Sequence, residues 1–339
     1  MSGGVDSSVA ALLLVQQGYE VDGVTLKLWG GETDSGCCSL SDVEDARRVA
    51  GELGIAHYVF NLGDEFTQHV VNPYLQAHEN LLTPNPCIEC NRHIKFAGLH
   101  DRAMAMGYDY VATGHHARVE KIDGIYRLLR GADPAKDQSY VLSMVTQEVL
   151  SHTLLPVGSM TKAQVREVAA ENGLRTASKA ESMDVCFIKK HGRQEFLSER
   201  IDLHPGKIID MQGNLVGEHE GAELLTIGQR RGAGNAIGSN AGEKQYVIER
   251  NPDDYSIIVG TKDELNVSQA NLNTVSFTRD ISFPCEVSVQ PRAHGSVFEA
   301  TWESPELITF KEPRTRIAPG QTAACYLEDE CIGSGIVTS

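Results

Sequence analysis

The feature that most constrains the fold of this chain is a change of pattern between residues 190 and 205. Before it, helical and strand patterns alternate; after it, short strand patterns dominate. Strands separated by helices predict a parallel sheet with helices on both faces. Short alternating apolar and polar runs predict a small β-barrel or sandwich. We therefore expect a doubly wound α/β unit followed by β-rich units.

The first half contains segments with helical periodicity, and several of them end at a glycine. We expect helices at 9–18, 41–54, 66–82, 94–107 and 161–173, and strands at 21–29, 55–62 and 108–115.

The second half reads as hairpins at 207–221 and 245–260, followed by strand patterns at 286–292, 296–303, 308–313 and 322–337. From these changes we expect three domains: 1–190, with a helical connector within 151–175, a small central β-rich domain at 191–255, and a C-terminal β-barrel at 256–339.

Composition restricts the class of protein. The chain has 339 residues, a formal net charge of −16 and 41% hydrophobic residues, which is ordinary for a globular protein and argues against nonspecific coating of nucleic acid. It shows no run of about 20 apolar residues and no signal peptide. Its eight cysteines have scattered spacings, unlike a secreted disulfide framework. We expect a cytoplasmic protein with no membrane association.

The run SGGVDSS at residues 2–8 has the composition of a phosphate-binding loop. Glycines allow backbone N–H groups to approach an anion, and the helix that follows has its positive end at the same place. The run lacks the lysine of a Walker loop and the third glycine of a dinucleotide fingerprint. A plain Gly-Gly turn before a helix is the simpler alternative.

Two segments carry the cysteines of interest, TPNPCIECNRHIKF at 83–96 and SMDVCFI at 182–188. Arg92 and Lys95 follow Cys87 and Cys90, and nearby cations lower the pKa of a thiol. A zinc site on this Cys-x-x-Cys pair and a core role for Cys186 are the alternatives. The remaining cysteines, Cys37, Cys38, Cys285, Cys325 and Cys331, are expected to be structural or loop thiols.

Further motifs occur along the chain together with the phosphate-binding loop and the two cysteine segments. The loop SGGVDSS resembles that of the N-type ATP pyrophosphatases, also called the PP-loop family. PNPCIECNRHIKF, ATGHH (112–116), GADPAKDQSYVL (131–142), LPVGSMTKAQVREVA (155–169), CFI (186–188), PGKI (205–208), IGQRRGAG (227–234) and PGQTAACY (319–326) occur in the order typical of bacterial tRNA-specific 2-thiouridylases. The chain therefore resembles that family along nearly its whole length.

The resemblance implies a tRNA-uridine 2-sulfurtransferase that uses ATP and Mg²⁺. ATP would adenylate O2 of the wobble uridine, and sulfur would replace that oxygen, giving 2-thiouridine, AMP and diphosphate. Ser2, Gly3, Gly4, Asp6 and Ser7 would hold the pyrophosphate, Asp6 would share the Mg²⁺, and Leu26 and Gly114 would border the adenosine.

The family's thiol chemistry maps onto two residues. Cys186 would carry a persulfide, and Cys90 would attack it, leaving a transient Cys90–Cys186 disulfide. The sulfur donor would be a cysteine desulfurase or a sulfur-relay protein. Relatives carry Cys or Asp at the position of Cys87, so a base role at this position stays open.

The implied RNA partner is a tRNA of the Lys, Glu or Gln type, with its wobble base flipped into the site. The family's contacts to the target base map onto Asn85, Pro86 and Cys87, and its other tRNA contacts map onto His115, Lys136, Asp137, Gln138, Arg292 and Gln321. Arg230 and Arg231 would contact phosphates or remain solvated. The family's aromatic residue beside Arg292 is missing here.

In doubly wound sheets a phosphate loop follows a central strand, whereas Met1 stands where the loop begins. We expect the natural chain to begin about ten residues upstream; a short form with a weakened ATP site is the alternative. Three other functions also stay open. They are an enzyme that adenylates a small carboxylate and adds ammonia, a non-catalytic sulfur carrier or RNA-binding module, and an iron–sulfur cluster on Cys87, Cys90 and Cys186.

Overall fold

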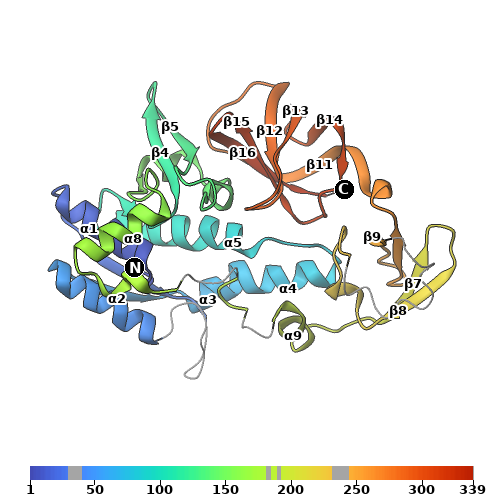
Figure 1. Cartoon of the computed structure of the whole chain (residues 1–339), viewed down its shortest axis with the longest axis horizontal. Coiled ribbons are helices and arrows are strands. Elements are labelled where there is room, and N and C mark those ends of the chain that lie inside the picture. Colours follow the sequence, from blue (N-terminus) through green and yellow to red (C-terminus); the bar gives the residue numbers. More distant parts are fainter. Residues whose placement is uncertain (30–39, 181–184, 189–191, 231–243, 339) are drawn as a thin grey trace.

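The computed structural model describes residues 1–29, 40–180, 185–188, 192–230 and 244–338 (Figure 1). Its first part alternates helices with short parallel strands, as the sequence predicts. The elements of this part are α1 (Val5–Gln16), β1 (Gly23–Lys27), α2 (Leu40–Leu53), β2 (His57–Asn61), α3 (Gly63–Phe66), η1 (Thr67–Val71), α4 (Asn72–Glu79), α5 (Pro86–Glu89), η2 (Cys90–Gly98), α6 (Leu99–Ala105), β3 (Val111–Ala112), η3 (Ser139–Leu142), α7 (Gln147–Ser151), β6 (Thr153–Leu154), α8 (Lys162–Glu171), η4 (Arg175–Ser178) and α9 (Gly192–Ser198).

The parallel strands form two pairs, β1 with β2 and β3 with β6. The strand expected at 108–115 is present only as Val111–Ala112. Helix α1 is apolar on most of its surface and packs its buried Val5, Val9 and Leu12 against residues of α8, which places α8 beside the start of the chain. The chain from Gly63 to Glu79 is helical throughout, although its middle turn is π-helical.

An antiparallel hairpin, β4 (Ala117–Ile122) and β5 (Ile125–Arg130), was not expected from the sequence. Its turn is Asp123-Gly124, and both residues have positive φ (53° and 84°). Asp-Gly between two alternating runs is a strong local signal for a two-residue hairpin turn, because such a turn matches the twist of the strands. The sequence therefore held the information for this hairpin.

The central part is a four-stranded sheet in the order β8-β7-β10-β9. Its strands are β7 (Gly206–Asp210), β8 (Leu215–His219), β9 (Tyr246–Arg250) and β10 (Ile257–Gly260), so both predicted hairpins are confirmed. Strand β10 pairs with β7 as well as β9. A boundary at residue 255 would divide this sheet, whereas one after Gly260 keeps it whole.

The C-terminal part is a closed barrel of six strands, because β11 pairs with β16 as well as with β14. Its strands are β11 (Asn266–Phe277), β12 (Cys285–Gln290), β13 (Phe298–Ser304), β14 (Leu307–Thr315), β15 (Thr322–Leu327) and β16 (Glu330–Val337). The barrel core contains the fully buried Trp302.

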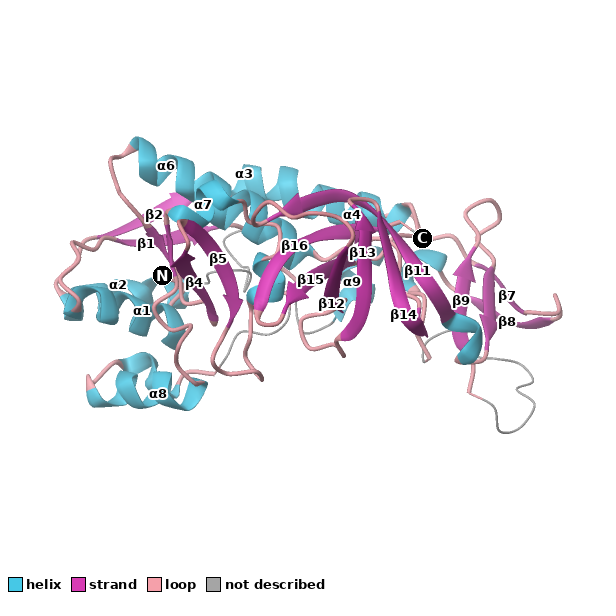
Figure 2. Cartoon of the chain, turned by 90° about the horizontal axis from the view of Figure 1, so that it is seen from above, coloured by secondary structure: helices cyan, strands magenta, loops and turns pink. Residues whose placement is uncertain are grey.

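The hairpin β4–β5 extends the sheet of the barrel. Leu128 and Leu129 of β5 pair with Cys331 and Glu330 of β16, and Figure 2 shows β5 beside β16. One apolar cluster contains Ile88 and Phe96 from the helical part and Tyr326 from the barrel. The barrel and the α/β part therefore share a core. Among the described residues, no helix is long and apolar enough to cross a membrane.

Candidate functional site

The loop before α1 presents uncapped backbone N–H groups. Gly4 is the N-cap residue of α1, and no side chain of the described residues caps this end of the helix. The Ser8 hydroxyl donates to the Gly4 carbonyl at 2.8 Å, and the Ser2 N–H donates to the Ser7 hydroxyl at 3.1 Å, which closes the loop on itself. Gly3 has φ of +69°, and a Cβ there would collide with the Asp42 carbonyl oxygen. The N–H groups at a helix end of this kind are available as hydrogen-bond donors to an anion.

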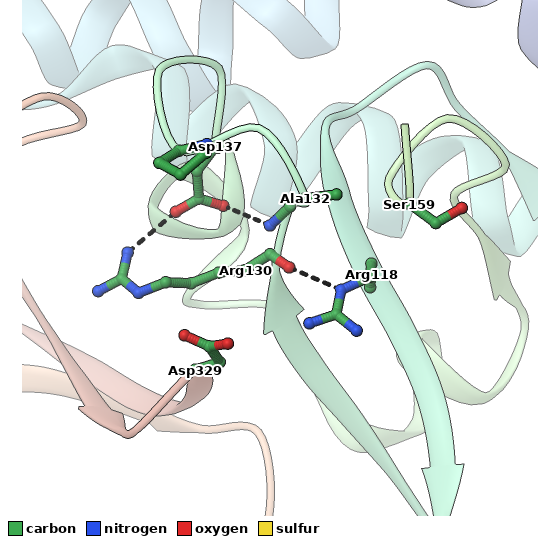
Figure 3. A pocket seen from close by; sticks show the side chains of 8 residues that line it. Arg118, Arg130, Ala132, Asp137, Ser159 and Asp329 are labelled. Atoms are coloured by element: carbon green, nitrogen blue, oxygen red, sulfur yellow. Dashed lines mark hydrogen bonds and ion pairs between the residues drawn. The ribbon is translucent and has the colours of Figure 1, made fainter. Parts of the chain in front are cut away.

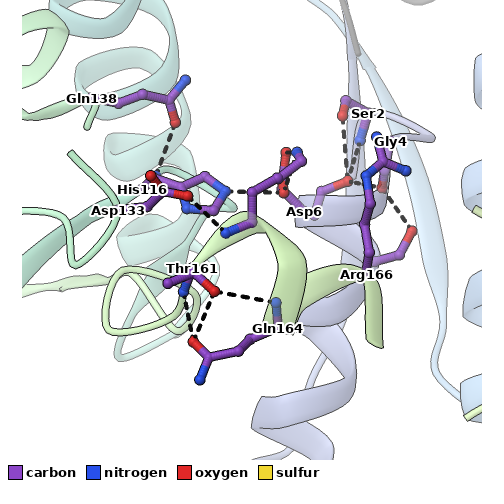
Figure 4. Close-up of polar contacts among 12 residues, drawn as sticks. Ser2, Gly4, Asp6, His116, Asp133, Gln138, Thr161, Gln164 and Arg166 are labelled. Atoms are coloured by element: carbon purple, nitrogen blue, oxygen red, sulfur yellow. Dashed lines mark hydrogen bonds and ion pairs between the residues drawn. The ribbon is translucent and has the colours of Figure 1, made fainter. Parts of the chain in front are cut away.

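Asp6 in the first turn of α1 is held by two side chains from distant elements (Figure 4). Lys162 Nζ lies 2.7 and 2.8 Å from the two carboxylate oxygens, and His116 Nε2 lies 3.1 Å from one of them. Burial disfavours the charged form, but the hydrogen bonds from His116 and Lys162 outweigh it. The pKa of Asp6 consequently lies below its ordinary value of 3.8.

Neither partner of Asp6 is among the site residues that the sequence predicts. Lys162 is the first residue of α8, where Thr161 and Gln164 form a capping box, and its N–H donates to the Asp133 carboxylate at 3.0 Å. His116 ends the ATGHH motif, and its N–H donates to Gln138 at 2.9 Å. The Thr-x-x-Gln pattern predicts the start of a helix at Lys162. The pattern does not indicate which acidic side chain pairs with the lysine.

Gly114 packs directly on the phosphate loop. A Cβ at this position would lie 2.6 Å from the carbonyl carbon of Asp6 and 2.6 Å from the amide nitrogen of Ser7. The glycine predicted to border the nucleotide therefore contacts the backbone of the loop. Leu26, the other residue predicted to border the nucleotide, is on β1. It packs against the apolar cluster that contains Cys90 and Phe66.

The two predicted reactive cysteines come from segments that share this cluster. Cys90 begins η2 and is 5% exposed. Phe187 is buried in the same cluster, and Val185 and Ile188 pack against it. Cys186, between these apolar residues, is exposed. The side chains on either side of Cys186 thus attach its segment to the core around Cys90.

The expected activation of Cys90 by cations is wrong for this structure. Burial of Cys90 raises the pKa of its thiol, and Lys95 opposes this only in part. Arg92, the other cation expected to lower this pKa, donates a hydrogen bond to Met144 Sδ at 3.7 Å. Cys90 is a free thiol, so the Cys90–Cys186 disulfide is not formed here.

The segment Asn85-Pro86-Cys87 begins α5. Asn85 is the N-cap residue, and its side-chain oxygen accepts from the Cys87 N–H at 3.1 Å. Proline suits the first helical position because it has no N–H to leave unpaired. Cys87 is half-buried. The Asn85 amide also donates to the Tyr140 hydroxyl at 3.5 Å.

Several predicted tRNA contacts have internal partners. Buried Asp137 accepts from Arg130, from Ser139 and from the Gly131 N–H, at 2.9 to 3.1 Å. Gln138 holds His116, as described above.

His115 and Gln321 are also engaged. His115 is buried, with its Nδ1 2.8 Å from the Thr113 hydroxyl, and burial keeps its pKa well below 6.5. Gln321 donates to the Thr83 carbonyl at 2.6 Å.

Two predicted cationic contacts lie at the surface of the protein. Arg292 and Arg230 are exposed, and Lys136 is half-buried. Arg231 lies outside the described residues.

A pocket of about 590 Å³ lies between the β4–β5 hairpin, the 131–137 segment and the barrel turn at Asp329 (Figure 3). Arg118 and Arg130 line it, and Asp137 holds Arg130 at 3.0 Å. None of the residues 2–7 lines it, so this pocket is distinct from the phosphate loop.

No group of three or more His, Cys, Asp or Glu side chains in the described part of the chain is arranged to hold a metal ion. Cys325 and Cys331 are buried in the barrel and Cys285 is half-buried, as expected of structural thiols. Cys37 and Cys38 lie outside the described residues.

Family models match three consecutive stretches of the chain. Residues 1–190 match a model described as the tRNA methyl transferase HUP domain. Residues 194–261 match the tRNA methyl transferase PRC-barrel domain, and residues 262–337 match an aminomethyltransferase β-barrel domain. Among solved structures, an NMN synthetase from Francisella tularensis is 19% identical over 54% of this chain and 64% of its own, with a TM-score of 0.34, too low to support an inference.

Curated relatives match over the full length. A protein from Moorella thermoacetica named tRNA-specific 2-thiouridylase MnmA is 43% identical, covering 100% of this chain and 98% of its own. Proteins of the same name from Desulforamulus reducens and Acidothermus cellulolyticus are each 42% identical, covering 99% of this chain and 95% and 96% of their own. The chain therefore belongs to the family of tRNA-specific 2-thiouridylases.

Proposed function

We propose that this protein is a tRNA-uridine 2-sulfurtransferase that converts a wobble uridine to 2-thiouridine. The observation that carries the proposal is the shared cluster around Cys90. It brings together Cys90, the segment of Cys186 and Leu26, which are far apart in the sequence. An ammonia-adding ATP pyrophosphatase would need neither thiol.

The phosphate loop is suited to ATP. The uncapped N–H groups of α1 and the hydroxyls of Ser2 and Ser7 offer donors to a leaving pyrophosphate. The Asp6 carboxylate supplies the hard oxygen ligand that Mg²⁺ prefers, so the residues fit this ion. Lys162 keeps the carboxylate ionised and adds a positive charge beside the phosphates. Bound Mg²⁺ would neutralise charge on the pyrophosphate.

The reaction would proceed in three steps. Uracil O2 attacks the α-phosphorus of ATP and displaces pyrophosphate. The terminal sulfur of a Cys186 persulfide then attacks C2, and AMP leaves with the original oxygen. Finally the Cys90 thiolate attacks the Cys186 sulfur, which releases 2-thiouridine and forms a Cys90–Cys186 disulfide. An external dithiol reductant restores the two thiols.

For the tRNA, we propose that Asn85, Pro86 and Cys87 face the flipped base, and that Arg292 and Lys136 contact the backbone. Gln321, Asp137, Gln138 and His115 have internal partners in this structure, which favours a role in holding the surfaces that touch tRNA.

Three further expectations remain proposals. The sulfur donor is a cysteine desulfurase or a sulfur-relay protein, the protein acts in the cytoplasm, and tRNAs of the Lys, Glu and Gln type are its substrates. We propose domain limits near residue 190 and after Gly260.

The test is an assay with ATP, Mg²⁺, unmodified tRNA and a cysteine desulfurase with cysteine. AMP and 2-thiouridine should both form, and 2-thiouridine should be lost in Cys186→Ser and Cys90→Ser. AMP formation with a small carboxylate, unaffected by Cys186→Ser, would instead support an ammonia-adding enzyme. Iron that co-purifies anaerobically with the wild-type protein and is lost in Cys87→Ser would support the iron–sulfur route.

A further inference from the structure

The hydroxyl of Tyr140 lies where the α/β part meets the barrel. The side chain is completely buried in the cluster that joins Ile88 and Phe96 to barrel residues. Its oxygen lies 3.1 Å from the Pro291 carbonyl and 3.2 Å from the Thr322 carbonyl. Pro291 directly follows the barrel strand β12, and Thr322 is the first residue of β15. It accepts from the Asn85 amide at 3.5 Å. One buried hydroxyl thus connects three distant parts of the chain.

Each of these three connections lies next to a residue proposed to contact the tRNA or to hold a surface that touches it. Pro291 precedes Arg292, a proposed contact, and Thr322 follows Gln321, a proposed support. Asn85 begins the segment proposed to face the target base. Tyr140 itself comes two residues after Gln138, at the end of the segment 136–138, in which Lys136 is the proposed tRNA contact. The hydroxyl is therefore common to the surfaces proposed to bind the tRNA and the loop proposed to bind the base.

A second contact joins the same parts. Gln321 donates to the Thr83 carbonyl at 2.6 Å, and the Thr83 N–H donates to the Pro319 carbonyl at 2.7 Å. Gly320, between them, has φ of +91°, and a Cβ there would lie 2.7 Å from the Thr83 nitrogen. The barrel loop is therefore fastened two residues before Asn85. Figure 1 shows the barrel above α4 and α5, which flank this segment.

We propose that Tyr140 is a positioning residue that makes the placement of Asn85-Pro86-Cys87 depend on tRNA bound to the barrel loops. This inference rests on the proposed function. A tyrosine hydroxyl has one proton, which it donates to either carbonyl while its oxygen accepts from Asn85. Hydrogen bonds in a chain polarise one another, so a shift of Pro291 changes the bond to Asn85. Binding at Arg292 is thereby coupled to the base-binding loop.

The test is Tyr140→Phe, which keeps the ring in the core and removes only the hydroxyl. At saturating tRNA we expect the single-turnover rate of 2-thiouridine formation to fall about tenfold, as for the loss of one well-placed buried hydrogen bond. The Kd for tRNA should rise less than the rate falls, because Tyr140 is buried and the proposed backbone contacts of Arg292 and Lys136 are kept. A merely structural defect would not separate the rate from the binding in this way.

Tyr326→Phe is the matched control. Tyr326 is buried in the same cluster, and its hydroxyl lies 3.0 Å from the Ser139 hydroxyl. Within the described residues it forms no hydrogen bond with Asn85, whose amide donates to Tyr140. We expect it to lower the thermal midpoint as much as Tyr140→Phe does while leaving the thiolation rate at the wild-type value. Both variants are assayed well below their thermal midpoints.

A double-mutant cycle with Asn85→Ala tests the route of the coupling. If the hydroxyl acts through Asn85, adding Tyr140→Phe to Asn85→Ala causes little further loss of rate. Three results would each overturn this inference while leaving the proposed function standing. The first is a double variant whose loss of rate is the product of the losses of the two single variants. The others are a wild-type rate in Tyr140→Phe and a loss of rate in Tyr326→Phe equal to that in Tyr140→Phe. A wild-type protein that makes no 2-thiouridine would overturn the proposed function and this inference with it.

Discussion

Gly114→Ala should disrupt the phosphate loop through one added methyl group. The new Cβ would lie 2.6 Å from the Asp6 carbonyl carbon and the Ser7 nitrogen, whereas ordinary contacts begin at 3.4 Å, so these atoms must separate by 0.8 Å. Both atoms belong to the backbone of α1, which cannot move aside as a flexible side chain could. Overpacking of this kind costs about 1–3 kcal/mol.

The functional loss should exceed the loss of stability, because Ser7 N–H lies in the turn proposed to hold pyrophosphate. We expect the KM for ATP to rise and AMP formation to fall at least about tenfold, since a displacement near 1 Å in a catalytic site is costly. The assay is AMP release at a range of ATP concentrations, with a thermal melt of the same sample.

Gly51→Ala is the matched control. Gly51 lies in α2, and a Cβ there meets nothing within 4 Å. Alanine should stabilise this helix by about 0.5–1 kcal/mol and leave AMP formation unchanged. Unaltered ATP kinetics and an unaltered melt in Gly114→Ala would refute the close packing of the ATGHH turn on the loop.

Three further outcomes are expected. Lys162→Met should lower AMP formation strongly and stability by about 1–3 kcal/mol, between the values for exposed and buried ion pairs, and Lys162→Arg should restore part of both; equal ATP kinetics in all three proteins would contradict a role for Lys162. Because the pKa of Asp6 is lowered, its contribution to stability is present above the ordinary value of 3.8 and is lost as pH falls through the folded-state pKa. The free energy of unfolding of Asp6→Asn, measured against pH, should lack that contribution. Parallel curves for the wild-type protein and Asp6→Asn below pH 3.8 would contradict the lowered pKa of Asp6. Since burial raises the pKa of Cys90, alkylation of Cys90 near neutral pH, read by peptide mass spectrometry, should be slower than alkylation of half-buried Cys285, and faster labelling of Cys90 would contradict its burial.

The alternation of helices and strands in the first half was predictable because each element carries its own periodicity and stop signals. The helix expected at 41–54 is present as Leu40–Leu53, and Gly54 follows it with φ of +70°. The two central hairpins were also predictable from their turns. These are local features, and local sequence determines them.

Contacts between distant segments were not predictable in the same way. The ion pair of Asp6 with Lys162 spans 156 residues, and nothing near either residue indicates the other. The pairing of β5 with β16 depends on the barrel presenting an edge at Glu330. The pKa of Cys90 was misjudged because its sequence neighbours are cationic, whereas its burial depends on residues that come from elsewhere in the chain.

The partners of Asp137 and Gln321 show the limit of carrying site residues over from a family. A motif indicates that a side chain matters, but the structure is needed to tell contact with the substrate from support of the surface. Here Asp137 is 5% exposed and holds Arg130, so its carboxylate serves the protein interior.

The most direct test of the central claim follows the oxygen that sulfur replaces. An anticodon stem-loop RNA with ¹⁸O at O2 of the wobble uridine is incubated with the protein, ATP, Mg²⁺ and the persulfide source for a single turnover. Mass spectrometry of the nucleotide products then locates the label. Adenylation of O2 predicts one ¹⁸O in AMP for each 2-thiouridine formed. Unlabelled AMP accompanying 2-thiouridine would contradict the account, because ATP would then have been cleaved by water or another acceptor.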